Sequence, residues 1–159
     1  MTIRAWRIVK AKHSTTAFTG EAAKAFPGRW NSRGVPMVYV ASSISLAILE
    51  VLVNLQSQEL LDRYALFEVS FDNALVFTIK PLGLPDTWRD LSPDNARIRT
   101  IGDDWISAGR SAVLGVPSAV VPDEWNYLLN PNHSDYVKIS VGPKRSFQLD
   151  PRLIKMPPT

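Results

Sequence analysis

The segment ISLAILEVLVNLQ, residues 44–56, constrains the fold more than any other part of this sequence. Its apolar side chains recur at the three-and-four spacing of one helical face: Ile44, Ala47, Ile48, Val51, Leu52 and Leu55. Leu46, Leu49 and Val53 add a second apolar face. We therefore expect a helix that is covered on most sides and lies at the centre of the core.

Glu50 is the only charged residue in this segment. A carboxylate rarely sits on a mostly buried helix unless it is paired or used. One explanation is a buried ion pair with an arginine such as Arg7. The other is a site in which Glu50 stabilises a developing cation or accepts a hydrogen bond from a sugar hydroxyl. The sequence alone leaves both open.

The remaining pattern mixes strands and helices without regular alternation. Strands are expected at residues 3–10 and 37–41, a short helix at 20–25, and a helix at 95–109 capped by Asp94. Residues 64–71 and 74–79 flank a turn-forming Asp72-Asn73 pair, which predicts a β-hairpin. A strand broken at Pro117, a connection at 123–131 and strands at 136–141 and 146–150 follow. This order predicts an α+β fold with mixed, largely antiparallel sheets.

Length and composition restrict the class of protein. A chain of 159 residues fits one domain, 1–159, and no stretch approaches the ~20 apolar residues of a membrane span. The N-terminus lacks the hydrophobic core of a secretion signal, so we expect a cytoplasmic protein. With no cysteine and two histidines, a metal site is not expected. The net charge of +3 is dispersed, which favours an anionic small molecule over nucleic acid.

The loop GRWNSRG, residues 28–34, is the first candidate binding segment. Arg29 and Arg33 could clamp a phosphate, because the guanidinium fork matches phosphate oxygens and neighbouring glycines allow close approach. Trp30 could stack against the ligand or anchor the loop, and Tyr39 could flank the same cavity. The alternative is that the arginines form surface ion pairs and both aromatic rings simply pack.

Ser118 follows a strand interruption and Asn126 lies in the segment NYLLNP, so each could orient a ligand or only satisfy the backbone. No base is placed to deprotonate Ser118, which disfavours hydrolysis through an activated nucleophile. Arginines, aromatic rings, one carboxylate and a serine instead suit a transition state with a stabilised cation and a good leaving group.

Two long segments, GRWNSRGVPMVYVASSISLAILEVLVN and VPSAVVPDEWNYLLNP, resemble the RES domain, the toxin of Xre-type bacterial toxin–antitoxin pairs. The name of that family denotes an arginine, a glutamate and a serine, which correspond here to Arg29, Glu50 and Ser118. The resemblance implies a fold similar to ADP-ribosyltransferase toxins and cleavage of the nicotinamide–ribose bond of NAD. It also implies a helix-turn-helix antitoxin of the Xre type as partner, and leaves room for a homodimer within the complex.

The resemblance assigns a role to each candidate residue. Arg29, Glu50 and Ser118 would be catalytic, and the substrate-binding group would be Arg7, Trp30, Arg33, Tyr39 and Asn126. NAD is then the substrate, and no further cofactor is implied. The acceptor of the ADP-ribose group could be water or phosphate, or a protein that becomes ADP-ribosylated. A different alternative is a ribonuclease-type toxin, which the dispersed charge of the chain disfavours.

Overall fold

The computed structural model describes residues 1–56, 58–59, 62–90 and 95–153. Its strands are β1 Thr2–Lys10, β2 Val38–Ala41, β3 Tyr64–Asp72, β4 Val76–Thr78, β5 Val113–Pro117, β6 Trp125–Leu129, β7 Ser140–Val141 and β8 Arg145–Phe147. The α-helices are α1 Glu21–Ala25, α2 Ile44–Leu52 and α3 Ala96–Ala108. Short 3₁₀ turns at 11–16, 73–75, 81–83, 134–138 and 151–153 connect them. The expected α+β class is confirmed.

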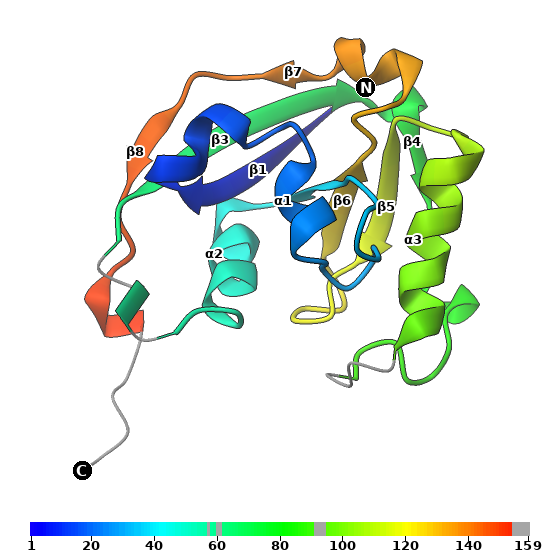
Figure 1. Ribbon diagram of the computed structural model, residues 1–159, viewed down its shortest axis with the longest axis horizontal. Helices are drawn as coiled ribbons and strands as arrows, with labels where there is room; N and C mark the ends of the chain where they lie inside the picture. Colours follow the sequence, from blue (N-terminus) through cyan, green and yellow to red (C-terminus); the bar gives the residue numbers. More distant parts are fainter. Residues whose placement is uncertain (57, 60–61, 91–94, 154–159) are drawn as a thin grey trace.

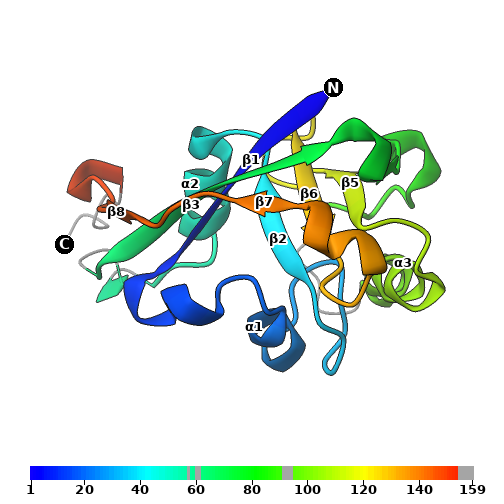
Figure 2. The same cartoon turned by 90° about the horizontal axis from the view of Figure 1, so that it is seen from above.

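In the part of the chain that the structure describes, eight strands form one curled sheet (Figures 1 and 2). Their order is β4-β5-β6-β2-β1-β3-β7, and β8 also pairs with β3. The longest pairing joins β1 to β3 from Thr2↔Asp72 to Lys10↔Tyr64. Every pair is antiparallel except β4 with β5, so the expected mixed and largely antiparallel sheet is present.

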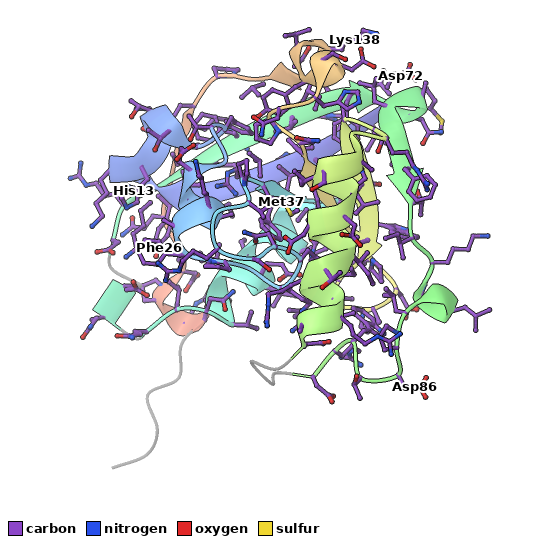
Figure 3. All side chains as sticks on the ribbon, turned by 45° about the vertical axis from the view of Figure 1, so that its right-hand side comes forward. His13, Phe26, Met37, Asp72, Asp86 and Lys138 are labelled. Atoms are coloured by element: carbon purple, nitrogen blue, oxygen red, sulfur yellow. The ribbon has the colours of Figure 1, made fainter. Side chains whose placement is uncertain are left out.

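Both faces of the sheet centre are buried. Along β5, Leu114 and Val116 pack under α3 with Trp30, whereas Val113 faces the opposite cluster. This alternation follows from the two-residue period of a strand. The segment from α1 to β2 crosses in front of the sheet between α2 and α3 (Figure 1). Met37 of this segment lies in the middle of the molecule (Figure 3), where it is 1% exposed.

Two predicted connections are wrong because strand partners are chosen by the whole fold. The 64–71 and 74–79 segments do not form a hairpin: β3 pairs with β1, and β4 pairs in parallel with β5 at the other side of the sheet. A 3₁₀ turn separates them, and Asp72 Oδ1 accepts a 2.7 Å hydrogen bond from Ala74 N within it. Residues 125–129, expected as a connection, form β6 between β5 and β2.

Helix α2 is shorter and less enclosed than its pattern predicted. Leu46 is 0% exposed, but Leu49 is 38% and Val53 60% exposed, because α2 packs on the sheet through one side. Ser43 caps its start by accepting from Leu46 N at 3.0 Å. The helix ends at Leu52, and the following Asn54 side chain donates to Glu50 O at 3.1 Å. Glu50 therefore lies in the last turn, near solvent.

Helix α3 confirms the helix expected near residues 95–109, although the Asp94 cap lies outside the described residues. Gly102 is buried where this helix meets the loop that holds Trp30, and a Cβ here would overlap the Trp30 carbonyl oxygen. The glycine therefore permits the close approach of helix and loop. None of the helices within the described ranges is both long and apolar enough to cross a membrane.

Candidate active site

Three polar side chains from separate segments meet at one oxygen atom. Ser118 Oγ donates to Glu50 Oε1 at 2.7 Å, and Asn126 Nδ2 donates to the same oxygen at 2.6 Å. Ser118 is 0% exposed, and its Oγ also accepts from the N–H groups of Val120 and Val121, both at 3.1 Å. The sequence named all three members of this cluster, which we call the Glu50 cluster.

Strand register explains why these residues converge. In the β5–β6 hairpin Val116 faces Asn126, and Ser118 N donates to Glu124 O at 2.9 Å just beyond the last pair. Asn126 also faces Ala41, the last residue of β2, and α2 begins three residues later at Ile44. Adjacent strand ends and the helix thereby bring together groups that are 68 and 76 positions apart in sequence.

Both hydrogen bonds of the Glu50 cluster to the carboxylate end on the same oxygen, Oε1. Within the described residues, Glu50 Oε2 accepts no hydrogen bond. A negative charge in the last turn of a helix also faces the negative end of the helix dipole. The placement of Glu50 is therefore unfavourable for the helix.

Asn126 carries a second unsatisfied group. Because its Nδ2 donates to Glu50, the amide orientation is fixed and Oδ1 is an acceptor. That oxygen is buried and has no hydrogen-bond partner among the residues described. Leaving a buried carbonyl unpaired costs about 1–3 kcal/mol. The cluster thus has both a free acceptor on Glu50 and a buried acceptor on Asn126.

Arg29 is held by backbone carbonyl oxygens of the segment at residues 88–90. Its Nη1 donates to Trp88 O at 2.9 Å and to Asp90 O at 3.1 Å. Burial lowers the pKa of Arg29, whereas the negative charge of Glu50 acts in the opposite direction, so the two groups interact electrostatically. The segment at residues 88–90 that holds Arg29 also contacts the turn after Ser118, because Arg89 Nε donates to Ala119 O at 3.0 Å.

Trp30 anchors the loop. It is 3% exposed in the cluster under α3, so the structure favours the anchoring alternative over stacking against a ligand. The backbone N–H of Trp30 donates to Tyr39 Oη at 3.2 Å, and that hydroxyl donates to Asn31 Oδ1 at 2.6 Å. A Cβ on Gly28 would lie 2.8 Å from the Tyr39 hydroxyl oxygen, so this glycine gives room to the tyrosine rather than to a ligand. Burial raises the pKa of Tyr39.

Asn31 organises this loop and was not anticipated from the sequence. It is 0% exposed, its Oδ1 also accepts from Gly28 N at 2.9 Å, and its Nδ2 donates to Ala23 O at 2.7 Å and Val35 O at 3.1 Å. Asparagine is common in turns because its amide bonds to nearby backbone. The preference of asparagine for turns is the sequence signal that could have identified Asn31.

Arg7 and Arg33 were also expected at the site, but the first is buried against backbone carbonyls and the second is exposed. Arg7 Nε donates to Ala17 O at 2.7 Å and its Nη1 to Tyr39 O at 2.9 Å, and burial lowers its pKa to about 10. It makes no ion pair with Glu50 in the described part of the chain, so that explanation of Glu50 is not supported. Arg33 is exposed on the loop.

The chain is similar to several known toxins along almost its whole length. A Yersinia enterocolitica protein named Toxin Res is 39% identical over 150 residues, which cover 93% of this chain and 97% of that protein. The Prs ADP-ribosylating toxin of a Sphingobium species is 38% identical over 161 residues, covering 98% and 99%. A chain of the M. tuberculosis MbcT–MbcA toxin–antitoxin complex shares the fold, with a TM-score of 0.76 at 18% identity over 96% of this chain and 87% of that chain. Residues 4–150 match the family described as RES domain, and the chain belongs to that family.

Proposed function

We propose that this protein is the toxin of a toxin–antitoxin pair and that it degrades NAD by cleaving the nicotinamide–ribose bond. Family membership and relatives named as toxins support the first part. The observation that carries the second is the Glu50 carboxylate, held through Oε1 by Ser118 and Asn126 with Oε2 free of hydrogen bonds from the described residues. Such a group suits the stabilisation of a sugar cation.

The proposed mechanism is dissociative. When the glycosidic bond breaks, its electron pair leaves with the pyridinium nitrogen, so nicotinamide departs neutral and positive charge develops on the ribose. Glu50 Oε2 stabilises that charge, while Ser118 and Asn126 keep the carboxylate in place. Water adds to the ribose carbon and loses a proton, which gives ADP-ribose. If phosphate adds to that carbon instead of water, the product is ADP-ribose with a phosphate on the carbon that nicotinamide left.

Glu50→Gln tests this mechanism. Glutamine keeps an oxygen that can accept from Ser118 and Asn126 but carries no charge, so the fold should persist. We expect nicotinamide release to fall by about 10²–10³-fold with NAD affinity little changed. Chromatographic assay of free nicotinamide and calorimetry with NAD measure the two. The matched control is Glu68→Gln, which neutralises a partly exposed carboxylate of β3 that pairs with Arg4 outside the Glu50 cluster, and it should keep full activity. Undiminished release by folded Glu50→Gln would refute the role.

A second function uses the same bond cleavage but transfers ADP-ribose to a protein. It is favoured by one observation, the 38% identity to a relative named as an ADP-ribosylating toxin. Incubating the protein with bacterial lysate and NAD labelled in its adenylate half separates the two. Label in small products supports degradation, whereas label on a discrete protein band supports transfer.

The proposed partner is an antitoxin protein of the Xre type, bound in the bacterial cytoplasm. The support is the shared fold with a chain of a toxin–antitoxin complex. Co-expression with the product of a neighbouring helix-turn-helix gene should yield a complex that releases no nicotinamide. Separate migration of the two proteins in size-exclusion chromatography would argue against that pairing.

A further inference from the structure

The backbone at residues 88–90 carries a second arginine beside Arg29. Arg29 Nη1 donates to the carbonyl oxygens of Trp88 and Asp90, the residues on either side of Arg89. Burial lowers the pKa of Arg29, and the positive charge of Arg89 lowers it further. Arg29 Nη1 therefore lies against the two peptide groups that flank Arg89, and the two positive charges oppose each other.

Neutral acceptors hold both arginines. Arg89 Nε donates to Ala119 O at 3.0 Å, and among the residues that the structure describes Arg29 donates only to carbonyl oxygens. Within the described ranges, neither forms a salt bridge to a carboxylate, although the charges of Glu50 and Asp90 act on Arg29 at longer range. Arginines oriented by carbonyls keep their full charge available, and a bound anion would relieve their mutual repulsion.

The contact to Ala119 also ties Arg89 to the Glu50 cluster. Ala119 directly follows Ser118, whose hydroxyl donates to Glu50. Arg89 thus reaches the same turn that holds the carboxylate, while its Nη1 and Nη2 groups make no hydrogen bond to the described residues. Arg89 is thus joined to the Glu50 cluster through the backbone of residues 118–119, and Arg29 is joined to Arg89 through the carbonyl groups on either side of it.

We propose that Arg29 and Arg89 together bind the diphosphate of a dinucleotide substrate, so that Arg89 is the second phosphate-binding arginine of this site. This inference rests on the proposed function and deepens it. Each guanidinium fork can pair bidentately with phosphate oxygens, and two forks match two phosphates. Arg89 thereby takes the part that the sequence assigned to Arg7 or Arg33.

Arg89→Gln tests the assignment through kinetics with NAD and calorimetry with ADP-ribose, which contains the diphosphate but no nicotinamide. Losing a charge-assisted contact to phosphate should raise both the KM for NAD and the Kd for ADP-ribose by about ten- to a hundredfold. The value of kcat should stay within about threefold, since binding is lost more than transition-state stabilisation. Arg145→Gln, which removes an exposed arginine of β8, is the charge-matched control and should change neither constant.

The alternative outcomes separate this inference from the proposed function. If Arg89 only positions the Ser118 turn, kcat falls while the Kd for ADP-ribose is unchanged, and the inference is overturned. Unchanged KM and Kd also overturn it. If the wild-type protein binds ADP-ribose but releases no nicotinamide, the proposed cleavage fails, while weaker ADP-ribose binding by Arg89→Gln still supports the diphosphate site. If wild type does neither, both are refuted.

Discussion

Replacing Gly102 by alanine tests how α3 fixes the loop that carries Arg29. In an ordinary helix interior the change would stabilise the protein by about 1 kcal/mol, since alanine is the better helix former. Here the added Cβ would overlap the Trp30 carbonyl oxygen and lie 2.8 Å from its carbonyl carbon. Because both are backbone atoms, the clash cannot be relieved by a side-chain rotation. The helix or the loop must move.

The magnitude follows from these two opposing terms. Overpacking a close-packed interior costs about 1–3 kcal/mol, and a clash with rigid backbone belongs at the upper end. Subtracting the gain in helix propensity leaves a destabilisation of about 2 kcal/mol. For a chain of this size that lowers Tm by about 4–8 °C. We also expect a higher KM for NAD, because Arg29 precedes the displaced Trp30.

Urea and thermal unfolding of Gly102→Ala measure the first effect, and nicotinamide release measures the second. Ser107→Ala, an exposed change in the same helix, is the matched control and should be neutral or slightly stabilising. A Gly102→Ala protein at least as stable as wild type, with unchanged KM, would show that α3 does not press on the Trp30 backbone. The proposed route by which the core positions Arg29 would then be wrong.

Two further predictions concern stability. Ser118→Ala removes a donor to Glu50 and the acceptor of two backbone N–H groups, so the free energy of unfolding should drop by about 2–4 kcal/mol and nicotinamide release should slow. A Ser118→Ala protein whose free energy of unfolding in urea equals that of the wild type would contradict this. Burial raises the pKa of all four tyrosines above 10.0, so the unfolded chain loses these protons first. The free energy of unfolding should therefore fall as the pH rises above about 10. The lowered pKa of Arg7 acts in the opposite direction, because the unfolded chain keeps that proton longer. Tyr39→Phe should make the free energy of unfolding less dependent on pH in this range. Constant stability above pH 10 would disprove it.

Much of the site could be predicted because its signals are local. Glu50 is conspicuous as the one charge in an apolar helical segment, and Ser43 caps that helix as serine commonly does. The motif resemblance then supplied Ser118 and Asn126, and the structure places both against the Glu50 carboxylate. Strand periodicity likewise predicted β1 and β2 to within a residue, since alternation depends on neighbouring residues.

The features that were missed depend on partners distant in sequence. A strand pattern does not specify its neighbour, so only the assembled sheet decided that β4 pairs with β5 rather than with β3. Arg89 has no local signal, because its relevance comes from the contact with Ala119 and from the carbonyls beside it that hold Arg29.

Sequence by itself thus determined the fold class, the family and the chemical groups of the site, because these follow from periodicity, composition and motif. Tertiary structure alone decided which of those groups point at each other. It placed the Trp30 ring in the core instead of against a ligand, because Gly102 lets α3 approach the loop backbone. It held Arg7 on two carbonyl oxygens away from Glu50, because burial and hydrogen bonding are settled only when distant segments pack.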